Sequence, residues 1–151
     1  MPLRVVAFNL VQVAACLYAL RRGGAPERWV AGMMAAAAVS TALLPYRPGL
    51  TFRSVDEPQL LVDVALMIGL TSLAVRADRY WPLWVAALQV IAIAAHLVRA
   101  MDATIVPAVY NQAIGKLAYP MILLLIAGTW RHRRRGLAGT RDADWSPLRW
   151  R

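Results

Sequence analysis

Hydrophobic and polar residues along this chain are separated into long blocks rather than mixed. Five apolar stretches are divided by shorter segments that contain arginine, proline, glycine and acidic residues. Apolar stretches that approach about 20 residues are typical of transmembrane helices. We therefore predict an all-α integral membrane bundle of five transmembrane helices, over residues 3–20, 29–44, 60–75, 81–98 and 105–130.

The fifth stretch ends in a way that indicates its orientation. It closes with Trp130, and a basic run follows at residues 131–135. A tryptophan followed by arginines is typical of the cytoplasmic end of a transmembrane helix. With five spans, twelve arginines fall on the cytoplasmic side and four on the opposite side. We predict an outside N-terminus, a cytoplasmic C-terminus and a multi-pass protein of the bacterial inner (cytoplasmic) membrane.

Residues 1–135 are predicted to form a single transmembrane domain, and residues 136–151 a polar cytoplasmic tail. The first stretch has the length of a secretory signal. However, only Arg4 precedes its apolar part, and Asn9 and Gln12 interrupt it. Signal peptides have a more basic start and an uninterrupted apolar centre. We interpret this stretch as a retained helix.

Composition agrees with a membrane protein, since 60% of the residues are hydrophobic and the mean hydropathy is +0.49. The net charge of +9 would suggest nucleic acid in a soluble protein. Here the arginines flank the apolar stretches, and the positive-inside rule accounts for them. We predict a lipid bilayer as the partner and no nucleic acid. The single cysteine, Cys16, excludes an intramolecular disulfide.

Two charged residues lie well inside the predicted helices, and both are expected to need a partner. By the helical rise, Asp63 lies roughly 5–8 Å and Lys116 roughly 13–16 Å below the outer boundary. Because a lysine stem can extend toward the membrane surface, we predict that the two meet, close to His96 and Gln112. Pro120 is predicted to kink the helix and free the Lys116 carbonyl.

Other polar residues of the outer half complete this candidate polar cavity. Its predicted members are Asp63, His96, Gln112, Lys116, Asn111, Gln12 and Asn9. Two interpretations remain open. The residues could form a functional cavity, or they could pair with one another and only hold the helices in register.

The second stretch contains a run of small residues that predicts close helix packing. Small side chains let two helix backbones approach, which is a main source of packing energy in lipid. The predicted packing residues are Gly32, Ala35, Ala36 and Ala38. The alternative is a bias toward alanine without a selected interface.

No motif in the chain indicates catalysis or a metal. The only histidines, His96 and His132, lie at opposite membrane boundaries, which argues against haem held by two histidines. Phosphate-binding glycine loops, nucleophile elbows and zinc-protease motifs are missing from the sequence. We predict no catalytic site, no metal and no cofactor. An enzyme would have to use Asp63, His96 and Lys116 alone.

Part of the chain resembles small multi-span bacterial integral membrane proteins of unassigned function. The resemblance covers roughly residues 55–130. It rests on the segments Leu60-Leu61-Val62-Asp63, Arg79-Tyr80-Trp81-Pro82-Leu83-Trp84, His96-Leu97-Val98-Arg99 and Ala118-Tyr119-Pro120. It implies no activity, only that certain positions should be inspected first: Asp63, Trp81, Pro82, Trp84, His96 and Tyr119.

Two functions from different classes fit these observations. The first is a non-enzymatic membrane protein, either an accessory or assembly subunit of another membrane protein or one that binds its own copies. The second is a small oligomeric transporter or channel that uses an outward-facing polar cavity around Asp63 and Lys116. Five spans with few intramembrane polar groups leave little room for a pathway within one chain, so transport would need an oligomer.

Overall fold

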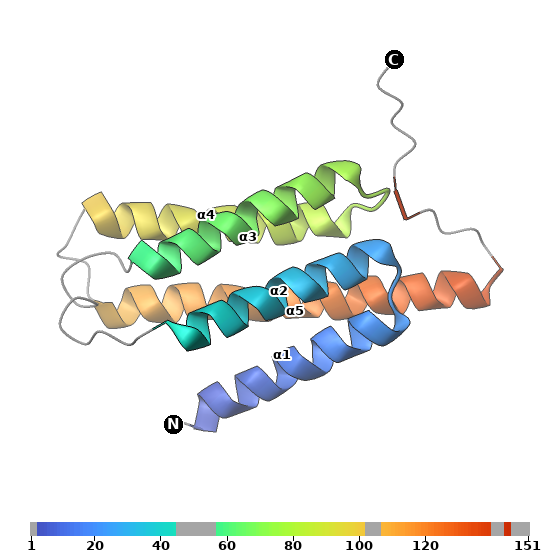
Figure 1. The fold of residues 1–151 in the computed structure, drawn as a ribbon, viewed down its shortest axis with the longest axis horizontal. Coiled ribbons are helices and arrows are strands. Elements are labelled where there is room, and N and C mark those ends of the chain that lie inside the picture. Colours follow the sequence, from blue (N-terminus) through green and yellow to red (C-terminus); the bar gives the residue numbers. More distant parts are fainter. Residues whose placement is uncertain (1–2, 45–56, 102–106, 140–143, 146–151) are drawn as a thin grey trace, which may run out of the picture.

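The structure, a computed structural model, is an all-α bundle, which confirms the predicted fold class (Figure 1). It describes residues 3–44, 57–101, 107–139 and 144–145, and within them all side chains except those of residues 57, 99, 100 and 107–114. Five helices follow one another along the chain: α1 (Leu3–Arg22), α2 (Ala25–Leu43), α3 (Glu57–Arg76), α4 (Trp81–Met101) and α5 (Pro107–Leu137).

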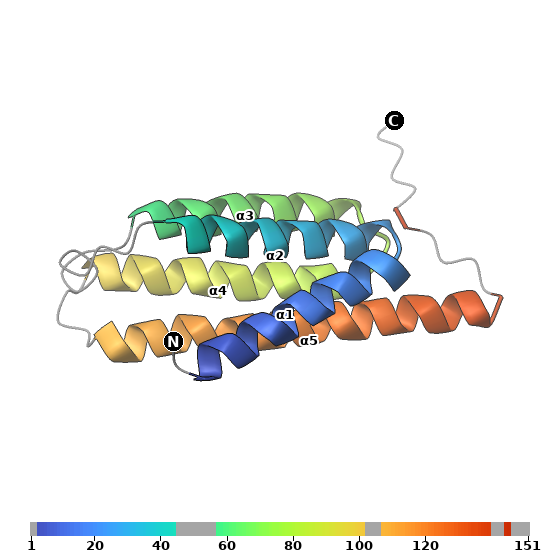
Figure 2. The same cartoon turned by 60° about the horizontal axis from the view of Figure 1, so that its bottom comes forward.

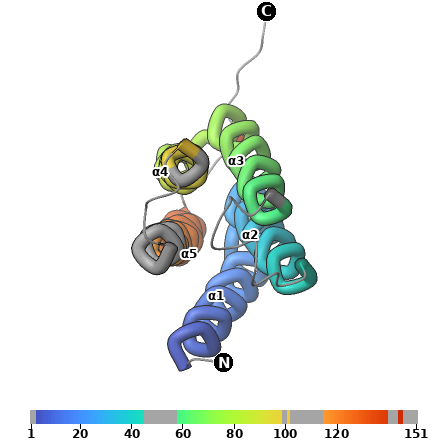
Figure 3. Tube along the Cα trace, turned by 90° about the vertical axis from the view of Figure 1, so that its left-hand side faces the viewer, coloured from blue at the N-terminus to red at the C-terminus, as the bar shows by residue number. Residues whose placement is uncertain are grey.

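The helices run up and down and form a closed ring. Each helix packs against the next one in the chain, and α5 returns to pack against α1, as the end view shows (Figure 3). Turning the bundle shows α1 crossing obliquely over α5 (Figure 2). The α1–α2 and α3–α4 turns lie at the same end of the bundle as the last turns of α5 (Figure 1).

Helix boundaries depart most from the prediction at two places, each for a local reason. The second helix begins at Ala25 rather than at residue 29, because Pro26 suits a first helical turn and Gly24 precedes it in an extended conformation. The fifth helix continues beyond Trp130 to Leu137. Arginine is a good helix former, so nothing stops this helix before Gly139, whose φ of 71° is left-handed.

The core is built mainly from small and aliphatic side chains. Ala19 and Ala31 are fully buried and let α1 and α2 approach closely, while Leu70, Val85 and Leu125 fill the space between the other helices. A close contact also joins α4 to α5, where a Cβ atom at Gly128 would lie 2.7 Å from the ring of Trp81. Only glycine lets the tryptophan ring lie against α5 here.

Many large apolar side chains point outward on the described helices, as expected for a surface that faces lipid. Three helical segments are long and apolar enough to cross a membrane: Leu3–Arg22, Pro58–Arg76 and Trp81–Val98. These three suggest a membrane protein. In α2 the first turn contains Glu27 and Arg28, and α5 has Asn111, Gln112 and Lys116 in its first half and arginines at its end. The apolar parts of these two helices are therefore shorter than the roughly 20 residues typical of a span, although both helices are long enough in total.

Candidate functional site

Two groups of polar side chains lie inside the described part of the bundle, one toward each end. We call them the Asp63 cluster, which consists of Gln59, Asp63, Gln89 and His96, and the Arg79 cluster, which consists of Glu27, Arg79, Trp81, His132 and Asp144. The Asp63 cluster joins α3 to α4. The Arg79 cluster ties together α2, the α3–α4 turn, α4, α5 and the C-terminal segment.

In the Asp63 cluster, one carboxylate organises three side chains. His96 Nε2 lies 2.9 Å from Asp63 Oδ2, and the amide of Gln89 donates to Asp63 Oδ1 at 3.1 Å. The same amide lies 3.1 Å from the Asp63 carbonyl, and Gln59 donates to Oδ2 at 3.4 Å. His96 and Gln89 are buried, each 3% exposed. The carboxylate is thus paired within the chain rather than left facing lipid.

Local geometry explains why these residues meet. Gln89 and His96 are seven residues apart on α4, about two helical turns, so they lie on one face. That face meets α3 near Asp63, and Gln59 lies one turn before Asp63 on the same helix. The structure therefore brings together Asp63 and His96 from the predicted polar cavity.

The predicted Asp63–Lys116 pair does not form and is corrected here. Lys116 lies on α5 with an exposed side chain, whereas Asp63 lies on α3 and is bonded to α4. In the end view α3 and α5 lie diagonally across the bundle, each beside α4 (Figure 3). The depths of the two residues are compatible, but their helices are not neighbours. The fifth helix runs through Pro120 without ending.

The remaining predicted cavity residues do not gather around Asp63 in the described part of the chain. Gln12 donates to the Met34 carbonyl of α2 at 3.3 Å, which ties α1 to α2. Asn9 is exposed on α1. The side chains of Asn111 and Gln112 lie outside the described residues. Gln12 and Asn9 therefore do not share a cavity with Asp63.

The small residues of α2 face in two directions. Ala35 packs against the core, whereas Gly32, Ala36 and Ala38 are exposed on the surface of the described bundle. The face of α2 that packs within the chain contains Val30, Ala31 and Met34 instead. Of the four predicted packing residues, only Ala35 packs within the chain; whether the exposed Gly32, Ala36 and Ala38 pack against another protein stays a prediction.

The Arg79 cluster is centred on a nearly buried guanidinium group. Nη1 of Arg79 pairs with Glu27 Oε1, and Nη2 lies 2.8 Å from Asp144 Oδ1 and 3.0 Å from His132 Nδ1. The indole of Trp81 donates to Glu27 Oε1 at 3.2 Å. The side chain of Arg79 is 5% exposed and that of Glu27 is fully buried. This is the most completely buried charge pair among the described residues.

Several chain segments have to meet for this cluster to form. Glu27 is in the first turn of α2, and Arg79 is in the turn between α3 and α4. Asp144 is brought in by an isolated antiparallel bridge between Ala77 and Trp145, with the amide of Asp78 donating to the Asp144 carbonyl at 3.4 Å. A Cβ atom at Gly24 would come within 2.9 Å of the His132 ring and closer still to the Asp144 carboxylate, so a larger residue there would displace these side chains.

Sequence analysis missed this cluster. Glu27 lies in a short segment between arginines that was predicted as a connection, and the tail was predicted only to be polar. The available signal was a single acidic residue, Glu27, among the arginines of a basic boundary. The family resemblance had pointed to Trp81, which the structure places in the cluster.

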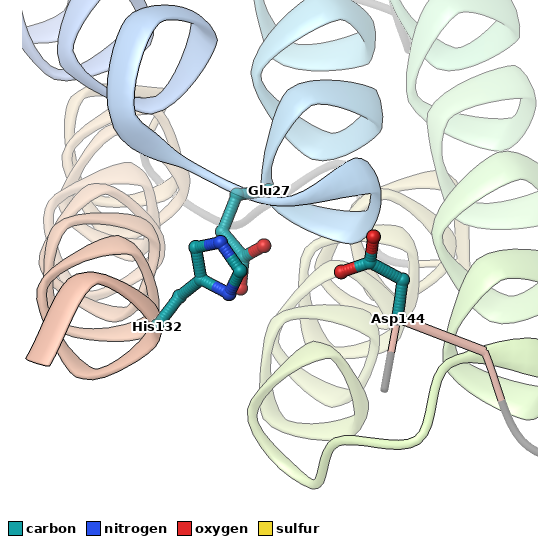
Figure 4. A group of neighbouring side chains, drawn as sticks. All are labelled: Glu27, His132 and Asp144. Carbon is teal, nitrogen blue, oxygen red and sulfur yellow. The ribbon is translucent and has the colours of Figure 1, made fainter. Parts of the chain in front are cut away.

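The donor atoms of Glu27, His132 and Asp144 lie within 4.8 Å of one another, as a metal site would require (Figure 4). Arg79, however, already contacts all three side chains. A divalent cation bound by these three side chains would lie next to the positive guanidinium of Arg79, and the repulsion between the two cations opposes binding. The three groups therefore hold an arginine, and their arrangement does not argue for a metal.

Comparison with known proteins found no matching family model, curated protein or solved structure. The resemblance to small bacterial membrane proteins therefore stays a prediction. The features that bear on function are the two internally paired clusters and the exposed apolar side chains of the described helices.

Proposed function

We propose that this chain is a non-enzymatic integral membrane protein that acts by associating with a second copy of itself through the outward face of α2. In this proposal all five helices span the bacterial inner membrane, with the N-terminus outside and the C-terminus in the cytoplasm. Association with a different membrane protein is the competing form of the same function, and the experiment below separates the two.

The distribution of charge supports the proposed orientation. Basic residues occupy the last turns of α1, α3 and α5, and these three helix ends lie at the same end of the bundle (Figure 1). Exposed aromatic side chains accompany them at the interface level, namely Trp29, Tyr80, Trp84 and Trp130. Arginines with an aromatic belt are typical of a cytoplasmic boundary.

The orientation has a direct test with single cysteines in a Cys16→Ala background. Cysteine in place of Arg134 is expected to react with a membrane-impermeant maleimide only after the membrane is opened. Cysteine in place of Leu3, at the opposite end of the bundle, is the control and is expected to react in intact cells. Labelling of position 134 in intact cells would contradict the orientation.

One observation carries the proposed association. Gly32, Ala36 and Ser40 are four residues apart on α2, and all three are exposed. A Cβ at Gly32 would meet nothing within 4 Å, so this strip is open to a partner. Beside it lies a groove of about 310 Å³ between α2 and α3, lined by residues that include Ala36, Ser40, Leu61 and Ala65.

Such a strip suits a second copy of the same helix. Residues four positions apart lie on the same side of a helix. Because the side chains of Gly32, Ala36 and Ser40 are small, two such helices can bring their backbones close together. In a two-fold dimer each α2 would present the same strip, so the surface has to complement only itself. The polar clusters support this interpretation, because the carboxylates of Asp63 and Glu27 are already paired inside the chain.

Ala36→Leu is expected to weaken self-association, because the added atoms keep the two backbones apart. Overpacking costs about 1–3 kcal/mol, which corresponds to a roughly 5- to 150-fold weaker dimer. Energy transfer between donor- and acceptor-labelled copies in lipid vesicles, measured over a range of protein-to-lipid ratios, reports the change. Ala94→Leu is the matched control, since Ala94 is exposed on α4.

Three outcomes of this experiment are informative. Equal energy transfer in the Ala36→Leu and wild-type proteins would contradict an α2 interface. An equal loss in Ala36→Leu and Ala94→Leu would show that any added bulk disturbs the bundle, and would also contradict it. The wild-type protein could also stay monomeric and copurify with one other membrane protein. If Ala36→Leu alone abolishes that copurification, the partner at the α2 face is that protein and not a second copy of this chain.

A second function, proton-coupled transport, is favoured by the Asp63 cluster. A carboxylate and an imidazole 2.9 Å apart are buried between two helices that are long and apolar enough to span a membrane. Ionisable groups at such depth are often part of a proton path. The original form of this alternative, with Lys116 beside Asp63, is not supported, so the transport proposal rests on His96 instead.

A further inference from the structure

A groove between the start of α4 and the end of α5 combines apolar and basic residues in a definite order. It has a volume of about 410 Å³. We call it the α4–α5 groove. Its lining includes Tyr80, Trp84, Leu124, Ala127, Arg131 and Arg135. It faces outward, since Tyr80, Trp84, Ala127 and Arg131 are all exposed.

The floor of the groove is rigid because it belongs to the Arg79 cluster. The ring of Trp81 lies against Gly128 of α5, and its indole nitrogen donates to the buried Glu27 at 3.2 Å. Ala127 adds little bulk beside Gly128, so the space between the helices stays open. The position of Trp81 in the groove is therefore held by Glu27 of α2.

Polarity changes along the groove over a short distance. Leu124 and Arg131 are seven residues apart on α5, about 10 Å along the helix axis. Leu124, Ala127 and Trp84 form an apolar section, and Tyr80, Arg131 and Arg135 lie toward the basic end of the bundle. The fifth helix has 31 residues, so its last turns extend beyond the other helices (Figure 1). A bilayer changes from acyl chains to phosphates over a similar depth.

We propose that the α4–α5 groove is a binding site for one anionic phospholipid of the cytoplasmic leaflet. The phosphate group lies at Arg131, with Tyr80 beside it, and the first part of an acyl chain lies along Ala127, Leu124 and Trp84. An arginine can donate two parallel hydrogen bonds to a phosphate, and tyrosine and tryptophan are enriched at the membrane–water interface, where phosphates lie.

The charges around the groove favour an anion. Among the described residues that line it, Asp78 is the only acidic one, against the basic side chains of Arg79, Arg131 and Arg135. Arg79 is neutralised by Glu27 and Asp144, so its charge is not needed for the lipid. Arg131 remains as an exposed guanidinium at the level where a headgroup would lie. A soluble anion would not account for the apolar section below it.

The site is tested by counting lipids that stay bound to the purified full-length chain in native mass spectrometry, after addition of phosphatidylglycerol or phosphatidylcholine. Wild-type protein is expected to retain one phosphatidylglycerol in preference to phosphatidylcholine. Arg131→Gln, which removes the charge, and Ala127→Phe, which fills the apolar section, are each expected to weaken that binding about tenfold.

Two matched controls separate the groove from general attraction to a basic surface. Arg133→Gln removes the same charge from the same helix at an exposed position outside the groove, and Ala94→Phe adds the same ring to an exposed position of α4. Neither is expected to change lipid binding. Arg134 is unsuitable as a control because its guanidinium lies 4.6 Å from the ring centre of Trp130.

Several results would overturn the proposal. An equal loss in Arg131→Gln and Arg133→Gln would mean that phosphatidylglycerol is held by diffuse charge. Equal retention of both lipids would mean that they only surround the protein. Displacement by millimolar glycerol phosphate would identify a soluble phosphate ligand instead. The site does not depend on the α2 interface, so energy transfer measured on the same variants distinguishes failure of one proposal from failure of the other.

Discussion

Glu27→Ala is expected to destabilise the folded bundle strongly. The change removes the carboxylate that pairs with the nearly buried Arg79 and accepts a hydrogen bond from Trp81. Breaking a buried ion pair by removing one partner costs about 3–5 kcal/mol. Arg79 keeps its contact with Asp144, but that side chain is 36% exposed and replaces the buried carboxylate of Glu27 only in part. The free energy of unfolding, measured by SDS titration in mixed micelles, should fall by up to that amount.

A neighbouring acidic residue offers the control. Asp78 is exposed and precedes Arg79 directly, and its main-chain amide donates a hydrogen bond to Asp144 that alanine retains. Asp78→Ala is expected to change the free energy of unfolding by no more than about 0.5 kcal/mol. A comparable effect of the two substitutions would contradict the assignment of Glu27 as the counter-charge of Arg79.

The double variant Glu27→Ala/Arg79→Ala completes this test. If the two side chains interact as the structure shows, removing both leaves no buried charge, and the loss should be smaller than the sum of the single losses. Arg79 also contacts Asp144 and His132, so the single Arg79→Ala variant should in addition release the C-terminal segment. Protease cleavage near residue 144 would report that release.

The second large effect is expected at Asp63. Asp63→Ala leaves the buried His96 without the carboxylate 2.9 Å away, while Gln89 keeps its hydrogen bond to the Asp63 carbonyl. A buried polar group that loses its partner costs about 1–3 kcal/mol, and the same unfolding experiment measures the loss. Asp63→Asn, which keeps an acceptor oxygen, should cost less. Adding His96→Ala to Asp63→Ala should recover part of the loss.

The same variants decide between structure and transport for the Asp63 cluster. If the pair only joins α3 to α4, wild-type protein in sealed vesicles should move no more protons than empty vesicles. If it belongs to a proton path, wild-type vesicles should acidify under an imposed potential, and Asp63→Asn should abolish this while the chain remains folded. Proton movement that persists in Asp63→Asn would exclude the carboxylate from the path.

The positions of the helices could be predicted closely from the sequence, because the signals are local. Pro82 suits the first turn of α4, and the observed helix begins at Trp81 as predicted. The third helix ends at Arg76, one residue beyond the prediction. The length of α5 was underestimated, because hydropathy detects only the apolar part of a helix and not the arginine-rich turns that continue it.

The candidate site was predictable only in part, and the two clusters show why. Asp63 and His96 were both selected as buried polar residues, but Asp63 was assigned the wrong partner. Depth in a membrane follows from counting residues along one helix, whereas the neighbour of a helix depends on the order of all five around the ring. Lys116 lies at a suitable depth in its helix, but that helix is not a neighbour of α3. The fifth helix packs beside α4 and α1 instead.

By itself, the sequence determined which segments are helical, how apolar each one is and where the arginines gather, since each of these depends on residues close together in the chain. Only the tertiary structure decided that Glu27, Arg79, His132 and Asp144 meet at one end of the bundle. These residues come from four segments, and no periodicity links them. Their contact depends on the packing of α2 against α5, and on the glycines that let Trp81 and the C-terminal segment approach.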